Sequence, residues 1–557
     1  MPKYSIGLDY GTLSCRALLV DVADGREIAS TVFEYPHKVI DTLLPDSNIK
    51  LGMNWALQHP ADWRQAISEV IPSVLSKSQV NAEDIIGIGV DFTSCTILPV
   101  DRFGEPLCLK PEWKNHPHSW PKLWKHHAAQ KEANRINQVA DSRAEAFVSR
   151  YGGKQSSEWE IAKVLQILND DPAVYDAMDR WIQGGDWVVW QLTGLERRQL
   201  STAGFKGIWS KKDGYPDKAF FAALDKRLEN YVEEKLTPAD TLLPLGSLAG
   251  GLTEKMAGIT GLKPGTPVSV ADLDAQVALP ALGITEPGRM LLIIGTSGCN
   301  IMLAKEERPV PGVAGIVEDG GGYPGLFCYE AGQNAVGDLF DWFVQRCMPA
   351  EYANEALERK ISPHQLLREK ASVKKPGETG LLALDWWNGN RSILMDADLT
   401  GVMVGMNLHT KPEDIYRTLL EATAFGQRVI MEAFKENNVP VYELVCGGGI
   451  AAKDEFMMQI YADVMNMELK IARSSQAPAL GAAIFGAVAA GKDAGGYAKL
   501  EDAAKKMGGV REKTYKPIPE NVLIYDRIYT EYKRLHDYFG RGENNVMERL
   551  KNIQNNK

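Results

Sequence analysis

Two short turns in the sequence combine glycine with hydroxyl side chains in a way that suits phosphate binding. They are "DYGTLS" (9–14) and "IIGTSG" (293–298), and each joins two apolar, strand-like runs. Glycine in a tight turn allows successive backbone N–H groups to converge on an anion. Both turns therefore indicate a site for phosphate oxygens. Their glycine and hydroxyl residues are Gly11, Thr12, Gly295, Thr296 and Ser297.

An acid, Asp9, ends the strand-like run just before the first turn. A carboxylate repels phosphate oxygens, so the role that suits it beside phosphate is to hold Mg²⁺ through water, because magnesium keeps most of its hydration shell. An ordinary hairpin whose aspartate accepts backbone hydrogen bonds gives the same pattern. The residues alone leave both interpretations open.

A second pair of acids, Asp272 and Asp274, ends the apolar run in "VSVADLDAQVALPALG" (268–283). A small-residue helix is expected directly afterwards, with Asp274 at its N-terminus, where the helix dipole favours the ionised form. Helix capping alone explains this pattern. A carboxylate at the carboxyl end of a strand also points into the crevice where α/β proteins bind ligands, and there it could accept a proton from a hydroxyl group.

Three glycines, Gly447, Gly448 and Gly449, follow a buried strand in "CGGGIAAKDEFMMQIYADVM" (446–465). They allow a flat group to approach the backbone before a helix begins. A glycine loop needed only for tight packing is the alternative. The chain has no G-x-x-x-x-G-K-[ST] motif, so a P-loop is not supported.

Polar groups able to hold a polyol occur in three clusters beside glycine. The clusters are "DFTSCT" (91–96), "GFKGIW" (204–209) and "YEAGQNAVGD" (329–338). Each mixes hydroxyl, amide and charged side chains, and each is a weak signal when taken separately.

The elements that would position these residues occur twice in the same order. In each half, strand-like runs around a turn precede an amphipathic helix, and more strands follow. The predicted strands of the first half are 4–9, 16–22, 27–35, 85–93 and 96–101, with a helix over 60–78. Those of the second half lie within 289–304, 441–448 and 468–473, with helices over 417–438 and 455–465. Strands followed by a crossover helix predict a layered α/β fold.

The second copy begins near Glu286-Pro287-Gly288, so we expect two related domains, 1–285 and 286–557, facing each other across a cleft. Residues 102–270 are expected to hold helical insertions, including 123–140 and 156–170. A helical tail is expected from about residue 494. An apolar stripe in "YDRIYTEYKRLHDYF" (525–539) predicts that this tail docks on the body of the protein.

The composition excludes several classes of function. The net charge of −10 argues against nucleic-acid binding, which needs clustered Lys and Arg. The seven cysteines lack metal-like spacing and are expected to be free thiols in a reducing compartment. No signal-peptide pattern is evident, and the apolar "ALGAAIFGAVAAG" is shorter than the roughly 20 residues of a membrane helix. We therefore expect a cytoplasmic protein with small-molecule partners and neither a nucleic-acid nor a membrane partner.

Taken together and in order over residues 4–490, several motifs resemble the FGGY family of sugar kinases, and within it the ribulokinase branch. The motifs are "IGLDYGTLSCRALLVD", "GVDFTSCT", "LWKHHAA", "ADLDAQ", "IIGTSGCNI", "YEAGQNAVGD", "LDWWNGNR" and "CGGGIAAKDEFMMQIYADVM". The resemblance implies an α/β fold of two ribonuclease-H-like domains, as in actin-like ATPases, hinged about a central cleft. It also implies ATP and Mg²⁺ as cofactors.

The resemblance assigns roles to matching positions. Asp9 is the magnesium-associated acid, acting through water, and Asp274 is the catalytic base. The implied ATP-binding residues are Gly11, Thr12, Gly295, Thr296, Ser297, Gly447, Gly448 and Gly449. The implied sugar-binding residues are Thr93, Ser94, Cys95, Thr96, Trp124, Lys206, Asp274, Glu330 and Gln333.

The implied activity is ATP-dependent phosphorylation of L-ribulose at its 5-hydroxyl group, the kinase step of arabinose breakdown. Alternatives are a related kinase for D-ribulose, another 2-ketopentose or a polyol, and a non-catalytic sugar or ATP sensor on the same fold. A homodimer is expected only by analogy. One position departs from the branch's usual "LWKDH", because His126 stands in place of the acid, and this puts any contact of that acid in doubt.

Overall fold

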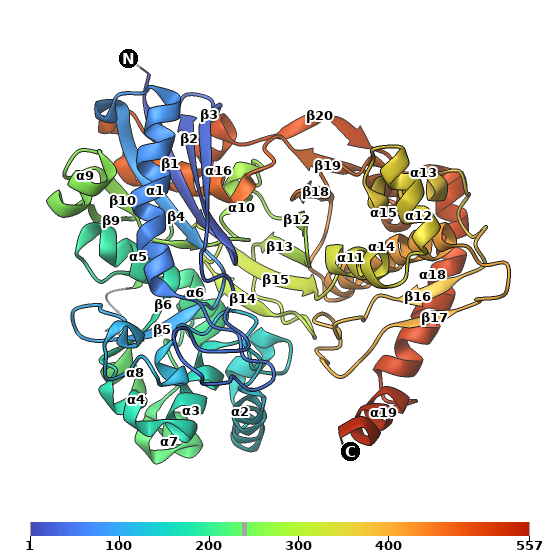
Figure 1. The fold of residues 1–557 in the computed structure, drawn as a ribbon, viewed down its shortest axis with the longest axis horizontal. Helices are drawn as coiled ribbons and strands as arrows, with labels where there is room; N and C mark the ends of the chain where they lie inside the picture. Colours follow the sequence, from blue (N-terminus) through green and yellow to red (C-terminus); the bar gives the residue numbers. More distant parts are fainter. Residues whose placement is uncertain (1, 237–241, 556–557) are drawn as a thin grey trace.

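The computed structural model describes residues 2–236 and 242–555 and has two lobes, each built on a seven-stranded sheet (Figure 1). In the first sheet the strand order is β3-β2-β1-β4-β10-β9, and β11 pairs with β4. Its strands are β1 (Tyr4–Tyr10), β2 (Ser14–Asp21), β3 (Glu27–Glu34), β4 (Ile85–Phe92), β9 (Leu248–Gly251), β10 (Pro267–Ser269) and β11 (Asp272–Leu273).

The second sheet has the order β14-β15-β13-β12-β18-β19-β20. Its strands are β12 (Arg289–Ile294), β13 (Gly298–Ala304), β14 (Gly315–Glu318), β15 (Phe327–Gln333), β18 (Glu443–Gly447), β19 (Leu469–Ala472) and β20 (Val510–Tyr515). The described helices that follow β15 within this lobe include α11 (Gly337–Arg346), α12 (Ala350–Glu358), α13 (Pro363–Ser372) and α15 (Glu455–Met465).

The two sheets repeat one topology, which confirms the internal repeat expected from the sequence. In each, a hairpin (β1–β2 or β12–β13) pairs antiparallel, and a third strand pairs antiparallel with its second strand. A long helix, α1 (Pro60–Ser78) or α14 (Pro412–Glu436), then leads to a strand that pairs parallel with the first. One further parallel strand follows, β10 or β19. Both glycine turns therefore lie at corresponding places.

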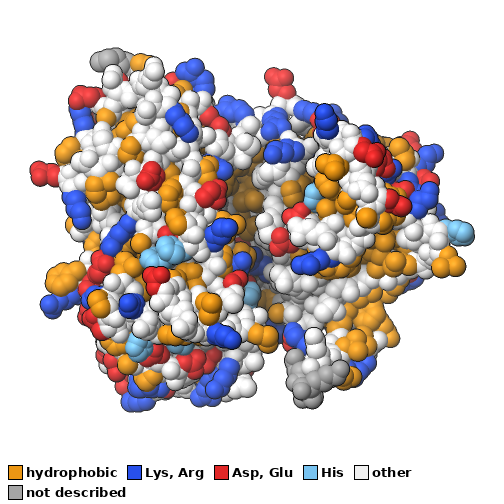
Figure 2. Space-filling view, viewed as in Figure 1, with side chains coloured by type: hydrophobic (Ala, Val, Ile, Leu, Met, Phe, Trp, Pro, Cys, Tyr) orange, Lys and Arg blue, Asp and Glu red, His pale blue; other side chains and the backbone are white. Residues whose placement is uncertain are grey.

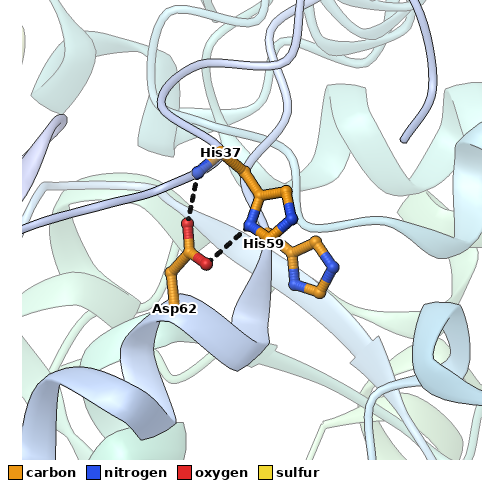
Figure 3. A group of neighbouring side chains, drawn as sticks. All are labelled: His37, His59 and Asp62. Atoms are coloured by element: carbon orange, nitrogen blue, oxygen red, sulfur yellow. Dashed lines mark hydrogen bonds and ion pairs between the residues drawn. The ribbon is translucent and has the colours of Figure 1, made fainter. Parts of the chain in front are cut away.

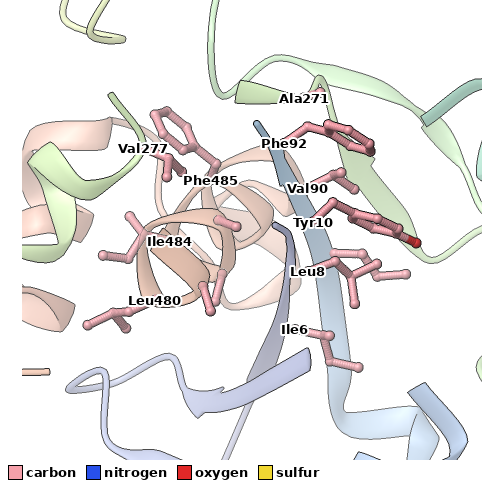
Figure 4. Packing of buried hydrophobic residues seen from close by; sticks show 14 of the residues in the cluster. Ile6, Leu8, Tyr10, Val90, Phe92, Ala271, Val277, Leu480, Ile484 and Phe485 are labelled. Carbon is pink, nitrogen blue, oxygen red and sulfur yellow. The ribbon is translucent and has the colours of Figure 1, made fainter. Parts of the chain in front are cut away.

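Helix α16 (Ala477–Ala490) packs directly against the backbone of the first sheet. Figure 4 shows Ile6, Leu8 and Tyr10 pointing to the side of the sheet away from this helix. The intervening residue, Gly7, faces the helix, because a Cβ added there would lie 1.8 Å from the carbonyl oxygen of Ala479. Only glycine permits so close an approach of strand and helix.

Near the C-terminal end, helices that come late in the chain pack on the first lobe rather than on the second. Helices α10 (Ala278–Ala281) and α16 lie between the two lobes, and α16 with α17 (Leu500–Met507) shares the hydrophobic core of the first sheet (Figure 1). The tail from about residue 494 also contains strand β20, which the sequence did not predict. Helix α18 (Pro519–Gly540) buries Tyr525, Tyr529 and Tyr532 against the second lobe, as the apolar stripe predicted; α19 (Val546–Asn555) follows.

Most of a mainly helical insertion between β4 and β9 has a separate core beside the first sheet, whereas its residues Trp187, Leu192 and Phe205 belong to the core of that sheet. Its elements include α2 (Gln130–Arg143), α3 (Glu160–Asp170), α4 (Pro172–Ala177), α5 (Gly184–Thr193), α6 (Leu200–Gly207), α7 (Lys218–Leu224), α8 (Tyr231–Lys235) and the strand pair β5 (Ile97–Val100) and β6 (Arg180–Gln183); α9 (Glu254–Thr260) follows β9. The helix predicted over 123–140 is wrong in its first part, since α2 begins at Gln130. Before it, Leu123 and His127 donate backbone hydrogen bonds to Ala56 and Asn54, which holds this segment in turns rather than in a helix.

Candidate active site

A cavity of about 290 Å³ lies between the two glycine turns, and Figure 2 shows the surface hollowed between the lobes. Most residues expected from the sequence to bind sugar or phosphate line this cavity. They are Thr12, Thr93, Ser94, Cys95, Trp124, Lys206, Asp274, Gly295, Thr296, Ser297 and Glu330. The fold thus brings together side chains that are more than 300 residues apart in the chain.

The first turn is closed by a hydrogen bond from the N–H of Gly11 to the carbonyl of Ser14, 2.9 Å. Thr12 links this turn to its surroundings. Its carbonyl accepts from the side chain of Gln58 at 2.7 Å, and its hydroxyl accepts from the indole N–H of Trp124 at 3.0 Å. Within the described part of the chain its own N–H has no acceptor, so this donor is available to an anion.

The second turn is closed in a similar way, by the N–H of Gly295 and the carbonyl of Ser297 at 3.0 Å. The start of α11 fixes it from behind, because the N–H groups of Val336 and Gly337 donate to the carbonyls of Thr296 and Gly295, each at 2.9 Å. The N–H of Thr296 has no acceptor among the described residues. Both turns therefore keep a donor that no described residue uses, and its use for phosphate oxygens stays a prediction.

Three carboxylates lie side by side on adjacent strands at the cavity end of the first sheet. Asp9 on β1 is the register partner of Asp91 on β4, which is in turn the partner of Asp272 on β11. Neither carboxylate oxygen of Asp91 has a hydrogen-bond partner in the described ranges, although the residue is fully buried. The sequence pattern predicted no role for Asp91 or Asp272 in such a group.

The electrostatics of this row suit a cation. Burial raises the pKa of Asp91 well above its ordinary value, and the neighbouring charges of Asp9, Asp274 and Asp272 raise it further. Burial also raises the pKa of Asp9, against the opposing effect of Arg16, whose guanidinium lies 3.9 Å away. Oxygen ligands without partners, crowded beside an anion site, fit a hard divalent cation such as Mg²⁺.

Asp274 lies in a turn after β11, where its N–H donates to the carbonyl of Phe92 at 3.1 Å. The prediction that it starts a helix is wrong, because α10 begins only at Ala278. The expected stabilisation of its charge by a helix dipole is wrong as well. Burial, followed by the charges of Asp9 and Glu330, raises the pKa of Asp274 to about 7. This carboxyl can therefore take up and release a proton near neutral pH.

The loop 93–96 follows β4 and is held from both sides. The hydroxyls of Thr93 and Thr96 are 2.7 Å apart, and Cys95 has a left-handed backbone with φ of 60°. The buried ammonium of Lys163 on α3 donates to the carbonyl of Cys95 at 2.8 Å and to that of Leu123 at 2.9 Å. One buried side chain thus joins this loop to the segment that carries Trp124.

Lys206 on α6 of the first lobe forms an ion pair with Glu330 on β15 of the second lobe. Its ammonium lies 2.9 and 3.1 Å from the two carboxylate oxygens, and the amide of Gln276 donates to one of them at 3.1 Å. Burial acts to raise the pKa of Glu330, but Lys206 and Arg391 outweigh it and hold the pKa below its ordinary value. Glu330 is therefore ionised and joins the lobes at the cavity.

Several predicted site residues lie away from the cavity lining. The amide of Gln333 donates to Asp385 at 2.8 Å and to the carbonyl of Thr423 at 2.9 Å, so it is committed to the packing of the second lobe. Thr96 is fully buried behind Thr93. The structure does not bring either side chain to the cavity.

The glycines after β18 lie beside the second turn but outside the cavity lining. Gly448 has a φ of 95°, and a Cβ there would lie 2.5 Å from the carbonyl oxygen of Ile294. Gly449 has no atom within 4 Å of such a Cβ and is exposed. Gly448 therefore fits the interpretation that the glycine loop is needed for tight packing. Gly449 has open space beside it and fits the interpretation that a flat group approaches the backbone.

His126, which departs from the ribulokinase pattern, is fully buried and does not line the cavity. Its Nδ1 accepts from the N–H of Ala56 at 3.3 Å, and its Nε2 lies 3.0 Å from the side-chain oxygen of Gln166. Burial lowers its pKa well below the ordinary value, so the ring is neutral. Its role here is to hold the Trp124 segment rather than to contact a ligand in the cavity.

One further cluster lies near the first turn (Figure 3). His37, His59 and Asp62 place potential metal-ligand atoms within 4.8 Å of one another. Asp62 accepts from His37 Nδ1 at 2.7 Å, and His59 Nδ1 accepts from the N–H of Ala61 at 3.2 Å. Acceptance at Nδ1 leaves the neutral His59 ring protonated at Nε2, so it offers no free lone pair. We assign this cluster to fixing the segment before α1.

The sequence did not predict some of the residues that line the cavity. Gln276 lies two residues after Asp274 in "ADLDAQ", and Arg391 ends "LDWWNGNR", so both stand inside motifs that carry the family resemblance. Glu158, Trp159 and Cys299 lay in segments assigned to a helix or a strand, where nothing in the pattern marked them as site residues.

A membrane-spanning helix is not found within the described ranges, since none of the helices there combines sufficient length with sufficient apolar character.

Two family descriptions match this chain. "FGGY family of carbohydrate kinases, N-terminal domain" matches residues 4–281, and the corresponding C-terminal domain matches residues 290–490. Among similar relatives, the ribulokinase of Geobacillus thermodenitrificans (strain NG80-2) is 58% identical over 550 residues, which cover 99% of this chain and 97% of that protein. The ribulokinase of Mycolicibacterium smegmatis is 47% identical over 557 residues, which cover 100% of this chain and 97% of that protein.

Two solved structures, both described as sugar kinases, share this fold. A xylulose kinase from Rhodospirillum rubrum aligns with a TM-score of 0.76 at 24% identity, covering 96% of this chain and 98% of that one. A gluconate kinase from Lactobacillus acidophilus aligns with a TM-score of 0.79 at 19% identity, covering 97% and 99%. These likenesses confirm the two-domain, mixed α/β fold of the actin-like ATPase class.

Proposed function

We propose that this chain, which belongs to the FGGY family of carbohydrate kinases, transfers the γ-phosphoryl group of ATP to the 5-hydroxyl group of L-ribulose. Family membership makes it a sugar kinase, and the ribulokinases among its relatives favour this sugar. In this proposal the reaction belongs to L-arabinose breakdown. The observation that carries the proposal is Asp274, a carboxyl group with a pKa near 7 in a cavity between two turns with free N–H donors.

The two turns hold the phosphates in this mechanism. The N–H groups of Thr12 and Thr296 face the polyphosphate from opposite lobes and fix it in line with the sugar. Asp9 and Asp91 are the residues that would hold Mg²⁺, which would supply positive charge beside the phosphates of ATP. The protein contributes little covalent chemistry to phosphoryl transfer, so positioning and charge stabilisation supply most of the rate.

Asp274 accepts the proton of the attacking hydroxyl group as the new bond to phosphorus forms. At neutral pH a substantial fraction of Asp274 is ionised and able to do so, because its pKa is about 7. Lys206 lies near enough to favour this ionised form. The sugar oxygens meet Lys206, Glu330 and Gln276, which line the same cavity as Asp274.

A related kinase acting on D-ribulose, L-xylulose or a polyol is the closest alternative, because a pocket of hydroxyl-binding groups tolerates epimers unless geometry forbids them. A non-catalytic sensor would have no need for a base, and the environment of Asp274 argues against it.

An ADP-release assay over a panel of ketopentoses and polyols tests the proposal. We expect the highest kcat/KM with L-ribulose, and phosphate at its 5-position in the isolated product. A higher kcat/KM with another sugar would replace L-ribulose by that sugar. No ADP release with any member of the panel would favour the sensor.

A further inference from the structure

We propose that Arg391, a residue of the second lobe that lies beside Glu158 of the first lobe, binds the sugar. This inference rests on the proposed function, since it takes the sugar to bind in the cavity between the turns. Arg391 lines that cavity. It was not among the residues that the family resemblance assigned to the sugar.

The backbone around Arg391 is fixed on both sides, so its side chain starts from a defined position. Asn390 and Asp396 exchange two backbone hydrogen bonds, of 2.8 and 2.9 Å. The N–H of Ser392 donates to the carbonyl of Gly332 at 3.1 Å, and the N–H of Gly332 donates back to the Ser392 hydroxyl at 3.2 Å. Gly332 lies on β15, two residues after Glu330. The loop is therefore attached to the strand that carries the ion pair of the pocket.

The guanidinium of Arg391 is incompletely satisfied. One terminal nitrogen lies 3.5 Å from Glu330 and 3.6 Å from Glu158. These are ion-pair separations, longer than the 2.7–3.2 Å of a hydrogen bond, and within the described residues its side chain makes no hydrogen bond at all. A guanidinium has five N–H donors and no acceptor.

The partners of Arg391 are already engaged or distant. Lys206 takes both oxygens of Glu330 at 2.9 and 3.1 Å, so this carboxylate is held mainly by Lys206. The side chain of Arg391 is 21% exposed, and the open side is the cavity. A largely buried cation with free donors beside a cavity needs acceptor oxygens. Sugar oxygens supply acceptors at that place.

The arrangement also couples the lobes. Glu158 and Lys206 belong to the first lobe, whereas Glu330 and Arg391 belong to the second, so the four charges alternate across the cavity and balance one another. A neutral sugar that bridges Arg391 and Lys206 would draw the same two lobes together. Sugar binding and closure of the pocket then occur together. The contact between Arg391 and the sugar contributes to sugar affinity more than to ATP affinity.

The test uses the full chain with the panel sugar that gives the highest kcat/KM. Arg391→Met keeps the length of the side chain and removes its charge and donors, whereas Arg391→Lys keeps the charge and loses the planar fork. Arg359→Met, at an exposed arginine paired with Glu369 in the same lobe, is the control. Steady-state KM values for sugar and ATP are measured, together with the sugar-induced shift in melting temperature, which reports binding without turnover.

We expect Arg391→Met to raise the KM for sugar about 10- to 100-fold, the range for losing a hydrogen bond to a charged group, and to abolish most of the sugar-induced thermal shift. The KM for ATP should stay within about twofold, the effect of Arg391→Lys should be smaller, and Arg359→Met should behave as the wild type. An unchanged KM for sugar, or an equal rise for ATP, would overturn the inference.

Glu158→Gln separates binding from a merely structural ion pair. If Arg391 acted only through its pairing with Glu158, this variant would reproduce the whole loss and the double variant would add nothing, which would overturn the proposal. We expect a smaller effect than that of Arg391→Met. Failure of L-ribulose as a substrate would show already in the wild type, whereas failure of the Arg391 contact would show only in the variants.

Discussion

The two glycine turns occupy corresponding places in two sheets of one topology, yet the residues around them differ in kind. Asp9 in the first sheet corresponds to Ile293 in the second, because each stands two residues before the glycine of its turn. The neighbour of Asp9 on the parallel strand is Asp91, whereas that of Ile293 is Gly447. Across each hairpin, Arg16 faces Asp9 and Cys299 faces Ile293.

This difference shows that a shared backbone does not impose a shared chemistry. Both turns offer N–H donors to phosphate, since those donors come from the backbone. The first sheet adds a row of buried carboxylates, and the second adds small and apolar residues. We therefore infer that the first lobe binds the cation and accepts the proton from the sugar, while the second lobe binds the nucleotide.

The largest effect is expected when the proposed base, Asp274, is removed from the first lobe. Asp274→Asn should lower kcat by about 10²-fold or more, because general-base catalysis contributes on that scale. Sugar and ATP binding, measured by calorimetry, should stay near wild type, since the amide keeps the shape. Near-normal turnover would remove Asp274 from the mechanism.

A second test addresses the cation. Asp9→Asn removes a negative charge from the row and should raise the Mg²⁺ concentration needed for half-maximal rate by about tenfold, the effect of losing roughly 1.4 kcal/mol. The measurement is a Mg²⁺ titration at saturating ATP and sugar. Asp141→Asn, at an exposed acid on α2, serves as the control. Equal Mg²⁺ dependence in Asp9→Asn and the control would place the cation elsewhere.

The smallest effects are expected from single threonine substitutions, one in each of the two glycine turns. Thr12→Val removes the acceptor for the Trp124 indole, whereas Thr296→Val removes a hydroxyl that faces the cavity from the second lobe. One hydrogen bond contributes about 0.5–1.5 kcal/mol, so each change should raise one KM by roughly two- to tenfold. We expect the KM for sugar to rise in Thr12→Val and the KM for ATP in Thr296→Val. The reverse pattern would contradict the assignment of the lobes.

The sequence predicted much of this architecture for physical reasons. Hairpin strands with a glycine turn and long amphipathic helices are local patterns, and they identified both copies of the fold. The prediction was wrong where distant contacts decide the local structure. Residues 123–129 form turns rather than a helix because Leu123 and His127 bond to residues 54–56, and Asp274 lies in a turn because β11 pairs with β4. Neither pairing leaves a trace in the local sequence.

The site predictions rest on residue types that themselves signal chemistry at Asp274 and the two turns, and the fold brings these residues to one cavity. Gln333 has a suitable type but points into the packing of its own lobe. The role of Arg391 depends on distances between chain segments that meet only after folding. The raised pKa of Asp274 likewise comes from burial and from neighbours on other strands, which overrule the local expectation of an ionised helix cap.

The central claim, that Asp274 serves as the base of the acidic lobe, is tested most directly by the pH dependence of kcat/KM for the sugar at saturating ATP and Mg²⁺. The base acts only when ionised, and its pKa is about 7. The account therefore predicts that the rate falls as the pH drops below about 7, approaching tenfold per unit, and levels off above it. The residual rate of Asp274→Asn should lack this step. A wild-type profile that is flat between about pH 5.5 and 8 would contradict the claim.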